Sequence, residues 1–237
     1  EAAIHHKDRL LKEFAAYHRR NIEEPWGDFE AYLIPMEGND LSKVAWLTDL
    51  LDRQGLTYST ARGSKKQVTA LDYTSLNSTL VRPLKGDLVI DAHQPNSALL
   101  QVLFDPDPEL SDSLTYDITT WALPFAYGLK SFGLNKSIDM TDGFITPFNP
   151  TKIDATSAPY AWIIDYSTDA GTPLLAHLLD EGIKVRVADS PFTNSGETFT
   201  AGTLVITKRN NEDKLGDIES IIAEYTSGTA GIRVLKT

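Results

Sequence analysis

The chain has 237 residues, of which 41% are hydrophobic, with a net charge of −11 at pH 7 and no cysteine. The acidic balance argues against nucleic-acid binding, because a phosphate-binding face needs clustered Lys and Arg. The lack of cysteine excludes disulfides, thiolate zinc sites and cysteine nucleophiles. No run approaches the roughly 18 apolar residues of a membrane-spanning helix, so we expect no membrane span.

The first quarter of the chain predicts a helix followed by a strand–helix–strand unit. Apolar residues recur at helical spacing from residue 2 to 22, interleaved with charges, which is typical of an amphipathic helix and not of a signal peptide. This helix is already under way at residue 1, so we expect the chain to be a fragment of a longer protein. The strand "EAYLIP" (30–35), the helix "LSKVAWLTDLLDRQG" with its cap at Asn39 or Asp40, and the strand "LTYSTA" (56–61) follow.

The middle of the chain is less regular. Residues 65–87 are strand-like, and residues 88–91 predict a strand end that leads through a Gln-Pro turn into a short apolar helix. The stretch 114–133 predicts a helix that is kinked or begins at Pro124. Residues 134–157 lack periodicity and are interpreted as a loop or linker.

The last third alternates strands and helices. Strands are expected at 160–166 and 183–189 and at "GIRVLK", and residues 196–207 are expected to form a hairpin-like element or another strand. Helices are expected at 167–182 and "NEDKLGDIESIIAEYTSG". Because strand–helix–strand units build parallel sheets, the predicted fold class is α/β, with a mostly parallel sheet covered by helices on both faces.

Searches for metal and phosphate sites find no motif. The five histidines occur in neither H-E-x-x-H nor H-x-x-E-H spacing, so we expect no metal site in this chain. The glycine-containing stretches at 63–66 and 227–231 do not match a phosphate-binding loop. The hydroxyl-rich stretch 190–203 is better explained by a hairpin than by a ligand loop.

Four residues remain as weak catalytic candidates. Ser167 lies between a predicted strand and helix but lacks the flanking glycines of a nucleophile elbow, so a helix cap is the simpler interpretation. Asp165 closes a predicted buried strand, and His93 and Asp189 lie at or near strand ends. No pattern joins them into a triad. Aromatic residues such as Trp121 and Tyr127 fit a sugar or nucleotide module no better than a core.

Three segments carry a resemblance to a known family. They are "EAYLIP" with the following helix, the block from "DAHQPNSALLQVLFDP" to "YDITTWALPFAYGL", and the run "AWIIDYSTDAGTPLLAHLLDEGIKVRVADSPFTNSGETFTAGTLVI". Together they resemble the region after the catalytic domain in Bacteroidetes-type zinc carboxypeptidases of the carboxypeptidase A-like superfamily. The resemblance implies a class I glutamine amidotransferase-like fold.

The resemblance carries no catalytic residue over to this chain. The family's H-x-x-E zinc ligands, distant histidine and glutamate base have no counterpart here, and the amidotransferase-like cysteine is missing. The resemblance therefore implies a non-catalytic accessory domain of a secreted or periplasmic metallocarboxypeptidase, with zinc held by an absent peptidase domain. The alternative is an independent α/β hydrolase or ligand-binding domain that uses the strand ends around Ser167.

The same reasoning predicts the domain organisation and partners. Residues 1–24 are expected to form a linker helix or the tail of a preceding peptidase domain, and residues 28–237 a single α/β domain. The expected partners are the upstream peptidase domain and a peptide or glycan substrate.

Overall fold

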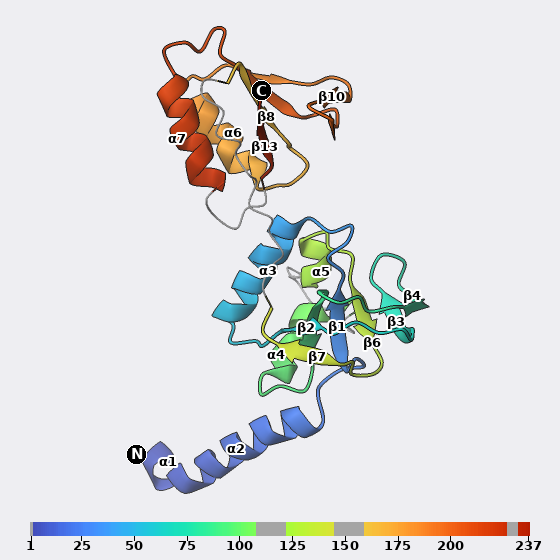
Figure 1. Cartoon of the computed structure of the whole chain (residues 1–237). Helices are drawn as coiled ribbons and strands as arrows, with labels where there is room; N and C mark the ends of the chain where they lie inside the picture. Colours follow the sequence, from blue (N-terminus) through green and yellow to red (C-terminus); the bar gives the residue numbers. More distant parts are fainter. Residues whose placement is uncertain (1, 108–121, 145–158, 227–231) are drawn as a thin grey trace, which may run out of the picture. The chain divides into compact units, whose positions relative to one another are not determined.

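A computed structural model describes residues 2–107, 122–144, 159–226 and 232–237. The chain forms two compact units, each described below by itself (Figure 1). The first unit comprises Glu1–Asn39 and Trp46–Ile145, and the second comprises Asp40–Ala45 and Thr146–Thr237. The single domain over 28–237 stays a prediction.

The first unit contains a seven-stranded sheet and several helices, two of them at the N-terminal end. The order of strands across the sheet is β4-β3-β6-β1-β5-β2-β7. The helices are α1 (Ala2–His5), α2 (Lys7–Glu23), α3 (Leu41–Arg53), which begins in the second unit, α4 (Ser97–Phe104) and α5 (Leu123–Ala126). The strands are β1 (Ala31–Ile34), β2 (Ser59–Ala61), β3 (Val68–Asp72), β4 (Asn77–Val81), β5 (Leu88–Asp91), β6 (Phe132–Leu134) and β7 (Met140–Asp142).

The prediction of a mostly parallel sheet is wrong. Each pair of neighbouring strands in the first unit is antiparallel, and the one parallel bridge among the described residues joins Ser59 to Gly143. The predicted strand–helix–strand unit does form as β1–α3–β2. However, β1 and β2 both pair antiparallel with β5, which lies between them. The crossover helix leaves a gap one strand wide, and a later strand of opposite direction fills it.

Both faces of the central strands are buried. Alternate residues point to opposite faces of a strand, so Ala31 and Leu33 of β1 lie on one face and Tyr32 on the other. The first face packs in one core cluster with Phe132 and Leu134 of β6 and with the smaller residues Ala61, Ala70 and Val89. On the second face the Tyr32 ring lies 4.8 Å from the ring of Phe104 in α4, measured between centroids. This burial explains why β1 has no polar position.

The second unit is built from a four-stranded antiparallel sheet and two helices. The order of strands is β13-β8-β12-β9, and β10 and β11 form a separate hairpin. Helices α6 and α7 pack together over one core cluster (Figure 1). The elements are β8 (Ala161–Ile164), α6 (Gly171–Asp180), β9 (Val185–Val187), β10 (Phe192–Asn194), β11 (Glu197–Phe199), β12 (Leu204–Thr207), α7 (Leu215–Thr226) and β13 (Val234–Lys236).

This order corrects the predicted amidotransferase-like fold for the second unit as well. Strands β8 and β9 flank β12, and β12 and β13 flank β8, so each strand–helix–strand unit is split by an antiparallel strand. Chain order β-α-β-β-α-β with this interleaving is the split-βαβ, or ferredoxin-like, topology. The prediction placed helices on both faces of the sheet, whereas α6 and α7 pack together in one core cluster. Each strand pairs with antiparallel neighbours and not with the parallel neighbours that were predicted.

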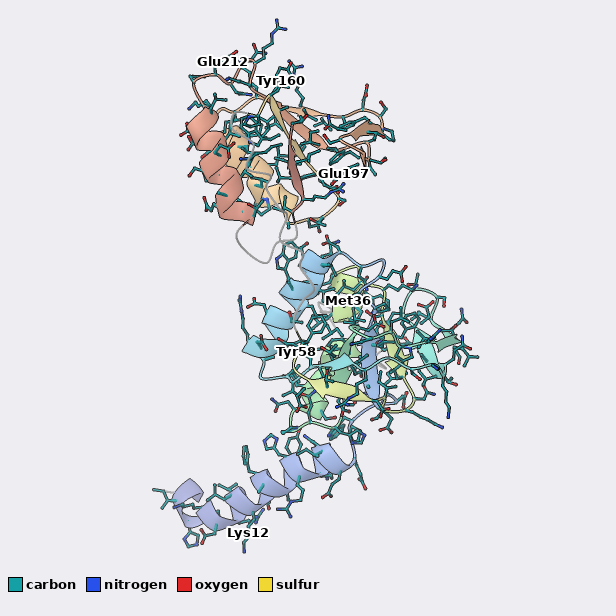
Figure 2. All side chains as sticks on the ribbon, viewed as in Figure 1. Lys12, Met36, Tyr58, Tyr160, Glu197 and Glu212 are labelled. Atoms are coloured by element: carbon teal, nitrogen blue, oxygen red, sulfur yellow. The ribbon has the colours of Figure 1, made fainter. Side chains whose placement is uncertain are left out.

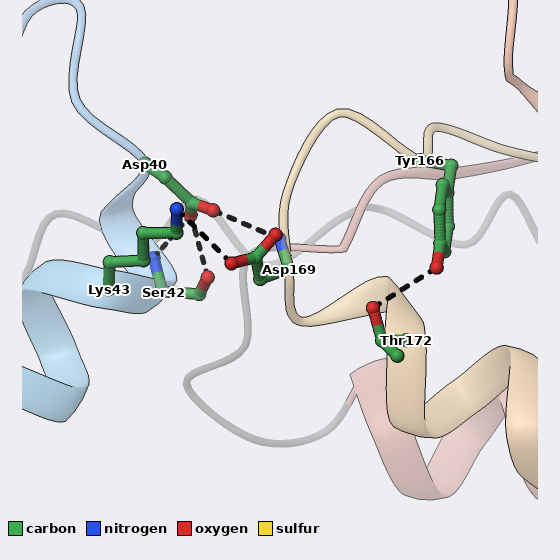
Figure 3. A network of polar contacts seen from close by, with 6 residues as sticks. All are labelled: Asp40, Ser42, Lys43, Tyr166, Asp169 and Thr172. Atoms are coloured by element: carbon green, nitrogen blue, oxygen red, sulfur yellow. Dashed lines mark hydrogen bonds and ion pairs between the residues drawn. The ribbon is translucent and has the colours of Figure 1, made fainter. Parts of the chain in front are cut away.

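A polar network lies at the start of α3 and α6 within the second unit (Figure 3). The Asp40 carboxylate accepts hydrogen bonds from the backbone and hydroxyl of Ser42, at 2.9 and 2.6 Å, which caps α3. Its other oxygen accepts the Asp169 backbone N–H at 2.9 Å, and Lys43 Nζ lies 3.2 Å from the Asp169 carboxylate. Asp40 is thus the cap, one of the two residues that the sequence proposed.

The region around α5 differs from the predicted helix over 114–133. Residues 114–121 lie outside the described residues, α5 has Pro124 in its first turn, and Phe132–Leu134 form strand β6. Strand β7 lies inside the predicted loop. These strands are only three residues long, too short for a visible period, and pairing with neighbouring strands is what makes them extended.

Candidate functional site

The candidates Asp165 and Ser167 lie together after β8 in the second unit. The Asp165 carboxylate accepts the Ser167 backbone N–H at 3.2 Å and forms an ion pair with Arg233 at 3.1 Å. Arg233 also lies 3.1 Å from Glu197 and stacks on the Phe199 ring. These contacts hold the loop to β11 and β13. Among the described residues, no hydrogen bond connects the Ser167 hydroxyl to a histidine base.

His93 belongs to the first unit, where it joins three segments. Its Nδ1 donates to the Ile22 carbonyl at 2.8 Å, and its Nε2 lies 2.6 Å from the Glu30 carboxylate. The Ile22 carbonyl, with Glu30, raises the pKa of His93 against the opposing effect of burial. Because both ring nitrogens have acceptors, the imidazolium form connects the end of α2 to the loop after β5.

The remaining sequence candidates have local roles or lie outside the described residues. Asp189 is exposed and accepts a hydrogen bond from the Ser190 hydroxyl at 3.1 Å. Tyr127 follows α5, and its backbone N–H caps the Leu123 carbonyl at 2.9 Å. Trp121 lies outside the described residues.

The sequence predicted neither a metal site nor a membrane-spanning helix in this chain. Within the described ranges, no group of three or more His, Asp or Glu side chains is placed to hold a metal ion. In the same residues, no helix combines the length and apolar character needed to cross a bilayer.

A cavity of about 430 Å³ lies at one end of the sheet in the first unit. Phe132, the first residue of β6, pairs with Leu33 of β1 and with Asp72 of β3. The loop after β1, the turn after β3 and the segment before β6 therefore meet at the same end of the sheet. The cavity is lined by residues from these three segments, at 38–39, 73–74 and 124–130. Its volume falls in the range of about 300–1,000 Å³ that is typical of small-molecule sites.

Most polar groups in the cavity wall are already bonded within the protein. The Asn39 amide donates to the Pro35 and Lys130 carbonyls, at 2.7 and 3.0 Å, and accepts the Lys130 backbone N–H at 2.8 Å. The Tyr73 hydroxyl donates to the Phe104 carbonyl, and burial strongly raises the pKa of Tyr73, so the phenol stays neutral. Asn39 and Tyr73 therefore shape the cavity and are not free to bind a ligand.

The cavity combines an apolar wall with one cationic side chain. Tyr73, Pro124 and Leu129 are buried behind the wall, and Phe125 is half-buried; the rings of Tyr73 and Phe125 lie 5.4 Å apart. Lys130 is exposed, and its Nζ lies 5.8 Å from the centroid of the buried Phe132 ring. Among the described residues, no carboxylate lies within ion-pair distance of Lys130, and no acidic residue lines the cavity.

Sequence reasoning missed this site. Its three segments lie up to about ninety residues apart, as the contact between Asn39 and Lys130 illustrates, and none contains a catalytic or metal-binding motif. Only the strand pairing around Phe132 brings them together. No local pattern could have indicated Lys130.

Comparison with known proteins found no matching family model, no similar curated protein and no similar solved structure. The resemblance to carboxypeptidase post-catalytic regions therefore rests on the three sequence segments alone.

Proposed function

We propose that this chain is a non-catalytic accessory region of a secreted or periplasmic zinc metallocarboxypeptidase, and that α2 packs against the peptidase domain. The zinc ion belongs to the peptidase domain in this proposal. The sequence resemblance supplies the identity of the partner, and the exposed apolar face of α2 is the observation that carries the packing role.

Helix α2 presents a continuous apolar face to solvent. Leu10, Leu11 and Phe14 are 48%, 56% and 65% exposed, and their spacing of three and four residues places them side by side on the helix. Single exposed apolar residues are ordinary, but a contiguous apolar patch is typical of an interaction surface. The polar side of the helix carries exposed charged residues, including Lys12 (Figure 2).

The C-terminal end of α2, in contrast, is firmly attached to the first unit. Asn21 is fully buried, donates to the Pro95 carbonyl at 2.8 Å and accepts from the Trp26 indole at 3.0 Å. His18 also contacts the Pro95 carbonyl, at 2.9 Å. A helix with one end anchored and an apolar face free is suited to connect this unit to a neighbouring domain.

The positions of the catalytic candidates also favour an accessory role. The Asp165 carboxylate is paired with Arg233, and both ring nitrogens of His93 have acceptors on other segments. Each group thus has a structural function in its own unit. A hydrolase that uses Ser167 as a nucleophile needs a base within hydrogen-bond reach of the serine hydroxyl. Among the described residues no histidine is hydrogen-bonded to that hydroxyl, which favours the accessory role.

The first test is the coding sequence upstream of Glu1. The proposal expects a reading frame that encodes an H-x-x-E motif with a distant histidine, preceded by a secretory signal peptide. A reading frame that begins near residue 1 would overturn the proposal. Hydrolysis of activated esters by the isolated chain that is lost in Ser167→Ala would overturn its non-catalytic part.

The second test probes the packing of α2 in the parent enzyme. A Leu11→Ser/Phe14→Ser variant should be cleaved by trypsin within α2 at least about tenfold faster, because each buried Leu or Phe contributes about 1.5–3 kcal/mol. Ala16→Ser is the matched control, since it introduces the same residue on the opposite side of the same helix and leaves every lysine and arginine in place. Equal cleavage rates in the two variants would show that the apolar face is not covered by the peptidase domain.

A further inference from the structure

We propose that a basic patch in the first unit binds an anionic lipid surface. The patch is formed by two loops, one at residues 62–66 after β2 and one at residues 82–86 between β4 and β5. Its five cationic side chains are all exposed: Arg62, Lys65, Lys66, Arg82 and Lys85. This inference does not depend on the accessory role, because the patch lies wholly within the first unit of this chain.

The fold holds the two loops of the basic patch against each other. The Ser64 backbone N–H donates to the Pro83 carbonyl at 2.9 Å, which joins one loop to the other. Gly63 has a φ of +81°, and a Cβ at this position would lie 2.8 Å from the Lys85 backbone nitrogen. A residue with a side chain would therefore be strained at position 63 and would push the loops apart. The close approach of the two sets of cations thus depends on this glycine.

The cations of the basic patch gather without carboxylate partners. Arg82 Nε donates to the Ser64 carbonyl at 2.8 Å, which holds the guanidinium against the loop that carries Lys65 and Lys66. Among the described residues, none of the five cations of the patch forms an ion pair. Like charges that are held together without counter-ions repel each other, and an anionic partner relieves this repulsion.

Two acidic residues adjoin the basic patch, and neither pairs with its cations. Asp87 is buried, and its carboxylate accepts the backbone N–H groups of Met36 and Leu84 at 3.1 and 2.8 Å. Asp139 is exposed, and its carbonyl accepts the Arg62 backbone N–H at 3.0 Å, but within the described ranges its carboxylate forms no ion pair. Acidic residues farther from the patch are largely screened, because the Debye length is about 8 Å at physiological ionic strength.

Exposed leucines beside the cations favour a lipid surface over a nucleic acid. Leu84 lies within the 82–86 loop and is 42% exposed, and Leu80, two residues before Arg82, is 60% exposed. Cations beside exposed apolar side chains suit a membrane interface, where the apolar groups enter the acyl boundary and the cations meet anionic headgroups. Sites for single-stranded nucleic acid instead present aromatic side chains on which bases stack. The one aromatic residue between positions 62 and 86 is Tyr73, which is buried.

The test is co-sedimentation of the full chain with lipid vesicles. Vesicles of equal parts phosphatidylglycerol and phosphatidylcholine should bind the chain, and vesicles of phosphatidylcholine alone should not. Lys65→Gln/Lys66→Gln should weaken binding by about 25-fold, because each Lys or Arg near an anionic leaflet contributes about fivefold to the partition coefficient. Lys208→Gln/Arg209→Gln is the matched control, since it removes two adjacent exposed cations of the second unit that form no ion pair among the described residues.

Further variants separate the lipid surface from other partners and from α2. Leu80→Ser/Leu84→Ser should also weaken vesicle binding, because the leucines enter the acyl boundary in this proposal. Dextran sulfate that binds more tightly than the vesicles, and equally well to the leucine variant, would identify a soluble polyanion as the ligand and overturn the proposal. Loss of vesicle binding in Leu11→Ser/Phe14→Ser but not in Lys65→Gln/Lys66→Gln would assign the binding to α2 and overturn it as well. So would equal losses in the lysine variant and its control, or the absence of binding to the anionic vesicles.

Discussion

The anchor of α2 predicts a large local effect for the substitution Asn21→Ala. The variant removes the hydrogen bond from Asn21 Nδ2 to the Pro95 carbonyl and the one from the Trp26 indole to Asn21 Oδ1. The Pro95 carbonyl keeps its contact with His18, and Trp26 is 47% exposed, so its indole can bind water. Two ordinary hydrogen bonds of about 1 kcal/mol each then give about 2 kcal/mol, or a 30-fold increase in opening of the helix end.

Hydrogen–deuterium exchange of the α2 amides measures this opening. The rate in Asn21→Ala should increase by about 30-fold in the last two turns of α2, if exchange follows the equilibrium population of the open form. Arg20→Ala is the control, because Arg20 is exposed on the neighbouring position and alanine favours the helix equally well. The same exchange rate in both variants would refute the role of Asn21 as an anchor.

Two further predictions concern His93 and Gly133 in the first unit, and Gly216 in the second unit serves as the control for Gly133. Because the pKa of His93 is raised in the folded protein, the stabilising contribution of His93 is complete below about pH 6.5 and is lost as the pH rises through the folded pKa. In the Glu30→Gln variant, titration of the His93 ring by NMR should give a lower pKa than in the unmodified protein. A pKa unchanged in Glu30→Gln would contradict the contact. Gly133→Ala should destabilise by about 1–3 kcal/mol, because the new methyl would meet the Phe29 ring at 2.8 Å. In Gly216→Ala in α7 the new methyl meets nothing within 4 Å, so this variant should raise the free energy of unfolding by about 0.5–1 kcal/mol. If denaturant unfolding gave changes of the same sign for Gly133→Ala and Gly216→Ala, the packing argument would be refuted.

The regular elements were largely predictable from local patterns. The apolar spacing in "LSKVAWLTDLLDRQG" predicts the helix that the structure places at Leu41–Arg53, and Asp40 caps it. The apolar runs around residues 31–34 and 161–164 form β1 and β8. These elements are predictable because helix periodicity, caps and continuous apolar runs depend on residues that are close in sequence.

The direction of the sheets was not predictable in this way. Strand–helix–strand order is compatible both with adjacent parallel strands and with a split unit that an antiparallel strand fills. The choice depends on β5, which follows β2 by about thirty residues, and on β12, which returns after the β10–β11 hairpin. Backbone hydrogen bonds can form in either arrangement, so non-local packing makes the decision.

The candidate sites also combine features that local sequence predicts with contacts that only the fold creates. The sequence identified "DAHQPNS" as a distinctive stretch, but the partners of His93 are Ile22 and Glu30, which lie more than sixty residues earlier. Lys130 lies in no recognisable motif, and only the fold places it beside the cavity.

The sequence by itself determined the acidic charge, the absence of cysteine chemistry, and the positions of the helices and buried strands. Only the tertiary structure decided the antiparallel pairing, the anchoring of α2 and the cavity at the end of the first sheet. The physical reason is the separation along the chain over which each interaction acts. Periodicity and capping act over a few residues, whereas strand pairing and a shared cavity join segments whose separation along the chain leaves no local trace.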